Sequence, residues 1–303
     1  MTEKFNIILN TTTACNYRCS YCSVVKDGKT LSDKLIGEII DFVERNTDFI
    51  HTFKFFWGEP LLSFENIKHI IDQTGGVLWN KFEIVTNTSL ITNEVWEYFS
   101  KYFETIFFSI DSENDFDYKK VFAFIAHHNI KDKIYFNLII SPWKENIAIE
   151  QFNRIYSNWY KNFNILPVYF TKNWIKKDLL ELSFSLRQII EVSLKDGEMK
   201  LYGFQKNNWY NYALTYPSLF LDIDSNIYYS DFVSTSFWKD IKNSLLLGRI
   251  QDINLSQKID VRNQKNILLE REKTIIKDTK WQKELHQIMD YFSLYLNKNN
   301  NAQ

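Results

Sequence analysis

Glycine, proline and cysteine are scarce in this chain of 303 residues. It has 8 Gly and 4 Pro, where average usage would give roughly 20 and 15. This scarcity excludes collagen-like chains and disordered chains rich in proline and glycine. Apolar residues make up 45% of the sequence and aromatic residues 17%, so a sizeable core is available.

An excess of one charge and long apolar runs are also missing. Lys and Arg number 36 against 37 Asp and Glu, a net charge of −1, so the composition predicts binding neither to nucleic acid nor to an anionic membrane. No apolar run approaches the ~20 residues of a membrane span, and the N-terminus lacks the features of a signal peptide. We therefore expect a cytoplasmic protein, in a compartment that keeps thiols reduced.

All 3 cysteines lie in one short segment, which reads Cys15-Asn16-Tyr17-Arg18-Cys19-Ser20-Tyr21-Cys22. An odd number at this spacing excludes a disulfide framework. The segment follows directly after the first predicted strand. Three thiolates on one loop are suited to hold three corners of a 4Fe–4S cube. The fourth iron then has an open position, where a substrate or cosubstrate binds.

The three cysteines have two alternative roles. A structural zinc site needs a fourth ligand beside the three cysteines. The candidates are the five histidines, His51, His69, His127, His128 and His286. None of them lies at the sequence spacing from the cysteines that is typical of zinc ligands. Buried structural cysteines are the second alternative. The three clustered cysteines favour an iron–sulfur enzyme. The alternative is a protein that binds a metal but catalyses no reaction.

Short β-like runs alternate with helical patterns through about residue 170, which predicts a parallel α/β fold. Strands are expected at residues 5–10, 52–57, 82–85, 105–111, 134–140 and 165–170, and helices near 32–46, from 63, from 92, at 115–128 and at 147–160. Ser32 and Thr92 are the predicted helix caps. Six such repeats favour an open, partial (β/α)6 barrel, although a flat doubly wound sheet has the same pattern. In both folds the ligand lies at the C-terminal ends of the strands.

The remaining chain predicts a smaller α+β region. We expect a core at residues 1–172, and then a linker helix at 175–200 and a β-hairpin at 218–233 within residues 173–255. The hairpin turn is Asp224-Ser225-Asn226. Residues 256–303 are charged and predicted to be helical, with a polar tail that frays from Asn297.

Four motifs together resemble the radical S-adenosylmethionine (SAM) superfamily. The first is the cysteine loop after the first strand. The second is Trp57-Gly58-Glu59-Pro60, which resembles the family's Gly-Gly-Glu-Pro with Trp57 in place of the first glycine. The third and fourth are Thr86-Asn87-Thr88-Ser89-Leu90, similar to Thr-Asn-Gly-Thr-Leu, and Ser109-Ile110-Asp111, similar to Ser-Leu/Ile-Asp.

The resemblance implies a fold, a reaction and a set of site residues. It implies a partial barrel in which Cys15, Cys19 and Cys22 ligate one 4Fe–4S cluster. SAM would be cleaved reductively to a 5′-deoxyadenosyl radical that abstracts a substrate hydrogen. The SAM contacts it implies are Tyr21, Gly58, Glu59, Thr86, Asn87 and Ser109. Lys119 or Lys120 would stand for a family arginine that pairs with the SAM carboxylate. The resemblance identifies no catalytic residue beyond these.

The C-terminal hairpin resembles that of SPASM and twitch domains. Asp224-Ser225-Asn226-Ile227-Tyr228-Tyr229-Ser230 is similar to Asp-Gly-Asn-Ile-Tyr-Pro-Cys, and Leu247-Gly248-Arg249-Ile250 is similar to the Leu-Gly-Asn-Ile that follows. Ser230 stands where the first auxiliary-cluster cysteine would be, and no cysteine follows it. We therefore expect a degenerate, cysteine-free SPASM-like region without an auxiliary cluster, which favours redox-neutral rearrangement, cyclisation or cross-linking.

The combination of motifs most resembles enzymes that modify ribosomally made peptides (RiPP maturation) or protein side chains. An enzyme acting on a sugar or aminocyclitol is the alternative. The resemblance implies a flavodoxin- or ferredoxin-type reductant. Because the first strand begins near residue 5, we expect a leader peptide to dock on the core or on a separate partner. A tyrosine would be able to donate the hydrogen atom, but 17 tyrosines leave that choice open.

Overall fold

A computed structural model describes most of the chain, namely residues 4–78, 81–111, 116–142, 144–168, 174–202, 218–230, 236–257, 263–270 and 282–300. Some expected elements reach beyond these ranges. They are the end of the strand at 165–170, the start of the helix at 115–128 and the end of the hairpin at 218–233.

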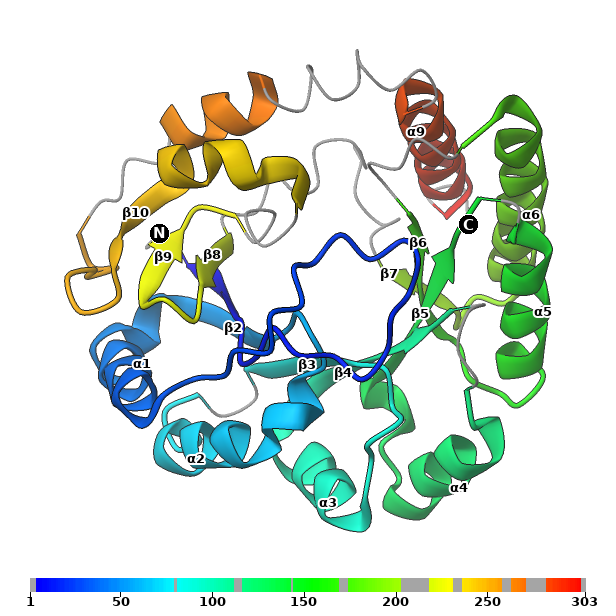
Figure 1. Cartoon of the computed structure of the whole chain (residues 1–303). Helices are drawn as coiled ribbons and strands as arrows, with labels where there is room; N and C mark the ends of the chain where they lie inside the picture. Colours follow the sequence, from blue (N-terminus) through cyan, green and yellow to red (C-terminus); the bar gives the residue numbers. More distant parts are fainter. Residues whose placement is uncertain are drawn as a thin grey trace.

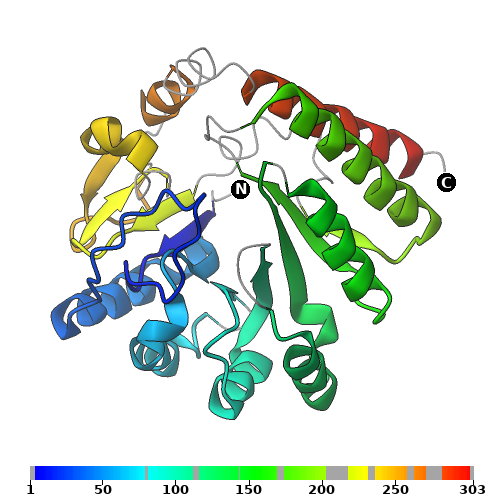
Figure 2. The same cartoon turned by 45° about the vertical axis from the view of Figure 1, so that its right-hand side comes forward.

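Within the described residues, ten strands form one sheet in the order β10-β9-β8-β1-β2-β3-β4-β5-β6-β7. The parallel part follows chain order, with β1 (Phe5–Leu9), β2 (Ile50–Phe55), β3 (Phe82–Thr86), β4 (Phe103–Ile110), β5 (Ile134–Ile140), β6 (Asn162–Pro167) and β7 (Lys200–Tyr202). Right-handed crossovers between strands in this order place every connecting helix on one face. The sheet therefore curls into the expected partial barrel, open between β7 and β10 (Figures 1 and 2). A doubly wound sheet would need a reversal of strand order.

The helices surround the outside of the curled sheet (Figure 1). They are α1 (Asp33–Asn46), α2 (Phe64–Thr74), α3 (Asn93–Tyr102), α4 (Tyr118–His128), α5 (Glu145–Tyr156) and α6 (Lys176–Lys195), with α9 (Gln282–Asn300) packed on α6. Ser32 and Thr92 are confirmed as caps, since their side chains accept from the backbone N–H groups of Leu35 and Val95. The helix α9 continues through Asn297 to Asn300, where fraying was expected. In the part of the chain that is described, no helix combines the length and apolarity needed to cross a membrane.

The predicted hairpin is present and continues the barrel sheet. Its strands are β8 (Ser218–Leu221) and β9 (Asn226–Tyr228), and β10 (Leu246–Arg249) pairs antiparallel with β9. The strand β8 pairs parallel with β1, with Ile8 opposite Phe220. Phe220 belongs to a second apolar cluster with Tyr228, Tyr229, Leu245 and Leu268, against which Ile8 and Trp57 pack. The C-terminal segment therefore lies against the strand that carries the cysteine loop.

The sixth strand begins earlier than expected, at Asn162 rather than Ile165. The prediction followed the apolar residues after 165 and ignored the polar ones before them. Asn164 is buried and donates its amide N–H to Asn137 Oδ1 on β5 at 3.0 Å. Asn162 is also buried and donates to backbone carbonyls of Asp132 and Ile134. These bonds satisfy the amides inside the fold, so both asparagines belong to the strand.

Candidate active site

The cysteine loop leaves the C-terminal end of β1 and crosses the mouth of the barrel (Figure 1). Cys15, Cys19 and Cys22 are half-buried thiols that are not joined in a disulfide. Cys22 donates its backbone N–H to the Cys19 carbonyl at 3.1 Å, which closes a turn between these two cysteines. Burial is the main cause that raises the pKa of the Cys15 thiol.

The fit of this loop to an iron–sulfur cluster rests on its donor atoms. Among the described residues, no three His, Cys, Asp or Glu side chains are already arranged around a common metal position. Thiolates are the ordinary ligands of such clusters, and all the cysteines of the chain are on this loop. The cysteines thus supply the right kind of donor atom on one loop at the expected edge of the sheet.

The loop after β2 packs directly on the base of the cysteine loop. Gly58 has a φ of +58°, and a Cβ atom there would lie 2.3 Å from the Thr12 carbonyl oxygen and 2.4 Å from that of Ala14. Glu59 donates its backbone N–H to the Ala14 carbonyl at 2.8 Å. Only glycine has both the conformation and the space that this contact requires.

Glu59, which is 1% exposed, joins two loops through its buried carboxylate. Its Oε1 accepts from Thr86 Oγ1 at 2.7 Å and from the Leu61 N–H at 3.1 Å, and its Oε2 accepts from the Asn87 N–H at 2.8 Å. Burial raises the pKa of Glu59 to about 7, although these three donors act in the opposite direction. Glu59 and Thr86 thus hold the loops that follow β2 and β3 together.

Asn87 extends this contact to the cysteine loop. Its Nδ2 donates to Asn16 Oδ1 at 2.9 Å, and Asn16 in turn donates to Ser89 Oγ at 2.7 Å. Asn16 lies between Cys15 and Cys19 in the sequence. The side chains after β3 therefore bind the cysteine loop directly, as their place at the strand ends predicts.

Asp111 is the site residue that the sequence reading did not single out. It follows β4, is 7% exposed, and its Oδ2 accepts from Tyr21 Oη at 2.7 Å and lies 3.7 Å from Cys19 Sγ. Ser109, two positions earlier, is half-buried on the same strand. The sequence feature that identifies Asp111 as a candidate site residue is its place as the last residue of the Ser-Ile-Asp motif.

The two expected lysines lie at the start of α4. Both are exposed, and Lys120 lines a groove between α3 and α4 together with Asn93 and Glu97. Lys120 Nζ lies 6.0 Å from the centroid of the Phe124 ring. These contacts place Lys120 in the outer helix layer.

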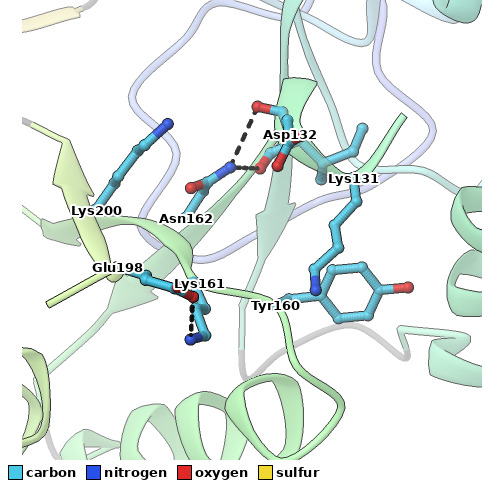
Figure 3. Close-up of a pocket in the computed structure, with 8 residues that line it drawn as sticks. Lys131, Asp132, Tyr160, Lys161, Asn162, Glu198 and Lys200 are labelled. Atoms are coloured by element: carbon cyan, nitrogen blue, oxygen red, sulfur yellow. Dashed lines mark hydrogen bonds and ion pairs between the residues drawn. The ribbon is translucent and has the colours of Figure 1, made fainter. Parts of the chain in front are cut away.

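A separate pocket of about 270 Å³ lies at the opposite ends of the strands (Figure 3). Ile134 and Asn162, which begin β5 and β6, line it together with Lys161, Glu198 and Lys200. Lys161 pairs with Glu198 at 2.7 Å. The residues at the N-terminal ends of barrel strands usually contribute to stability. This pocket lies at those ends, whereas the cysteine loop follows the C-terminal end of β1.

Comparison with known proteins agrees with this geometry. Residues 9–134 match the sequence model of the Radical SAM superfamily, a segment that contains the cysteine loop and the ends of β2, β3 and β4. The radical SAM cyclopropyl synthase TigE of Paramaledivibacter caminithermalis is 29% identical over 120 residues, which cover 33% of this chain and 25% of TigE. The chain thus aligns with a quarter of that relative's length.

Solved structures show a similar fold over most of the chain. The structure of anSMEcpe with bound AdoMet superposes with a TM-score of 0.71 at 14% identity and covers 98% of this chain and 99% of that one. SuiB of Streptococcus suis, bound to S-adenosylmethionine, gives a TM-score of 0.64 at 14% identity over 88% of this chain and 68% of SuiB. Residues 9–134 therefore match the Radical SAM sequence model, and most of the chain has a fold similar to those of these two structures.

Proposed function

We propose that the protein cleaves SAM reductively and uses the resulting 5′-deoxyadenosyl radical to abstract a hydrogen atom from its substrate. The observation that carries this proposal is the position of the three cysteines. They lie on one loop at the C-terminal end of β1, bound by residues that follow β2, β3 and β4. A 4Fe–4S cluster on Cys15, Cys19 and Cys22 would supply the electron and an open iron position for SAM.

The surrounding residues have separate tasks in this proposal. The backbone of Gly58 and the side chains of Asn87 and Ser109 would contact SAM, and Tyr21 would lie against the adenine. Glu59 and Thr86 have their oxygens engaged with each other and with backbone N–H groups. Their contribution to SAM binding is therefore to fix the loops on which Gly58 and Asn87 lie.

We propose one cluster per chain and chemistry that needs no auxiliary cluster as electron acceptor. The hairpin would be a degenerate SPASM-like region, since Ser230 is buried where a cysteine would be expected and no cysteine follows Cys22. A flavodoxin- or ferredoxin-type protein would deliver the electron. A rearrangement needs no further electron acceptor. A cross-link or cyclisation that joins two C–H positions releases one proton and one further electron after the hydrogen abstraction, and this electron would return to the cluster, so that SAM is the net oxidant.

The substrate class we propose is a ribosomally made peptide or a protein side chain. Two structural neighbours have been solved with peptides, SuiB with the precursor peptide SuiA and anSMEcpe with the Cp18Cys peptide. Their fold over most of this chain supports a peptide at the same mouth of the barrel. A leader peptide would dock on the core or arrive with a separate partner.

The test is iron, sulfide and SAM cleavage on the anaerobically reconstituted chain. We expect about four iron and four sulfide per chain and formation of 5′-deoxyadenosine with dithionite. Cys19→Ala should lose both the cluster and the cleavage. Val25→Ala, an exposed change on the same segment, is the matched control and should retain both. Zinc in place of iron, or cleavage by Cys19→Ala, would overturn the proposal.

A further inference from the structure

Asp111 connects the end of β4 to the cysteine loop through its carboxylate. Its Oδ2 accepts from Tyr21 Oη at 2.7 Å and is 3.7 Å from Cys19 Sγ. Its own backbone carbonyl accepts from Gln151 Nε2 on α5 at 3.0 Å. Asp111 is 7% exposed, and the contact from Gln151 fixes its backbone at the end of β4.

The contact with Cys19 changes character when the sulfur binds iron. The Cys19 thiol donates a hydrogen bond to the carboxylate. A thiolate ligand has no proton to donate, so a negative carboxylate would then face a negatively charged ligand. Charge and hydrogen bonds near the sulfurs are the factors by which a protein sets the reduction potential of an iron–sulfur cluster.

Tyr21 acts on the same oxygen with the opposite effect. Its hydroxyl donates to Asp111 Oδ2 and so withdraws part of the negative charge from the side that faces Cys19. Tyr21 is itself next to Cys22 in the sequence. The hydrogen bond therefore also fixes the last part of the cysteine loop on β4.

We propose, on the basis of the function proposed above, that Asp111 is a positioning residue that anchors the cysteine loop through Tyr21 and lowers the reduction potential of the cluster. A low potential is needed because the electron must be transferred to a sulfonium ion. The reduction potential of the cluster is measured without any substrate.

The test is an EPR-monitored redox titration, without SAM, of the reconstituted wild type, Asp111→Asn and Tyr21→Phe. Asp111→Asn should raise the potential by about 59 mV, a tenfold change in the ratio of reduced to oxidised cluster for one electron. Tyr21→Phe should lower it, because the carboxylate loses a donor. Asp41→Asn on α1, an exposed removal of the same charge, should leave it unchanged.

The outcomes separate this inference from the proposed function. A wild type that binds no iron would overturn the function and leave nothing to titrate. A wild type with a cluster whose potential is the same in Asp111→Asn would overturn the inference alone. If Asp111→Asn loads less iron, the anchoring role is supported, and Tyr21→Phe then decides the electrostatic one. A shift to higher potential in Tyr21→Phe would contradict it.

Discussion

Lys242 Nζ lies 2.6 Å from Asp222 Oδ2, and this ion pair connects the C-terminal segment to the base of the cysteine loop. Asp222 follows β8 and is 8% exposed. Its other oxygen, Oδ1, accepts from Asn10 Nδ2 at 3.1 Å, and Asn10 follows β1. Lys242 also reaches Asp224 at 3.5 Å and covers the Tyr228 ring at 4.7 Å. The ion pair between Lys242 and Asp222 therefore lies where the chain leaves the paired strands β8 and β1.

We expect Lys242→Met to destabilise the fold by about 2 kcal/mol, because it leaves a buried Asp222 carboxylate without its cation. The double change with Asp222→Asn should cost less than the sum of the two single changes, since it removes the unpaired charge as well. Urea unfolding of the four proteins in the cycle measures this. Additive costs would show that the pair contributes nothing of its own.

Gly58 allows a sharper comparison with a second glycine. Gly58→Ala forces both a left-handed backbone and a Cβ atom into the Thr12 and Ala14 carbonyls. Gly28 also has a positive φ, +76°, but open space around it. Gly28→Ala should therefore cost only about 1–2 kcal/mol of backbone strain, and Gly58→Ala should cost more and also lower the iron content. Equal losses of stability in thermal unfolding would contradict the contact.

Trp57 is a tryptophan in the left-handed region, with φ 75°, and its ring stacks on Phe56 at 4.4 Å. Trp57→Ala and Trp57→Gly both remove the ring, but only alanine retains the strain. We expect the glycine variant to be more stable than the alanine variant by about 1–2 kcal/mol. At an ordinary exposed loop position with negative φ, the order of the two variants would reverse.

The buried carboxylate of Glu59 predicts a dependence of stability on pH. Its pKa is about 7 in the fold, above the ordinary 4.5, so between these values the native state binds a proton that the unfolded chain has released. The free energy of unfolding should therefore fall as the pH rises from 4.5 to 7, by up to about 3 kcal/mol from this group.

Glu59→Gln lacks the titration and is the reference for this measurement. Denaturant unfolding of both proteins between pH 5 and 8 should show the wild type losing stability relative to the variant as the pH rises. Glutamine has one accepting oxygen where glutamate has two, and its NH2 group cannot accept from the Asn87 N–H in place of Oε2, so the variant begins from a lower stability. A difference that stays constant with pH would show that Glu59 is charged throughout this range.

The barrel was predictable because its local signals agree with its tertiary contacts. Ser32 and Thr92 are caps in the sequence and in the structure, and the strand at 134–140 has its expected bounds. The three cysteines were predicted at the end of the first strand, and they lie there. These features depend on neighbours in the sequence.

The remaining features depend on contacts between distant residues. No local pattern states that Ser218–Leu221 pairs with β1, because any apolar strand would satisfy the same hydrophobic pattern. Asn162 and Asn164 read as loop residues until their burial against β5 is known. Asp111 belongs to the Ser-Ile-Asp motif, but its contacts with Tyr21 and Cys19 join residues that are 90 and 92 positions apart in the sequence.

The position of β1 between β2 and β8 sets an order of events during synthesis. Its first neighbour begins at Ile50 and its second only at Ser218. Until the ribosome has released the later segment, β1 is an edge strand with one row of backbone groups unpaired. Of the strands β1 to β7, β1 is synthesised first, yet its pairing is completed only when Ser218–Leu221 has been made.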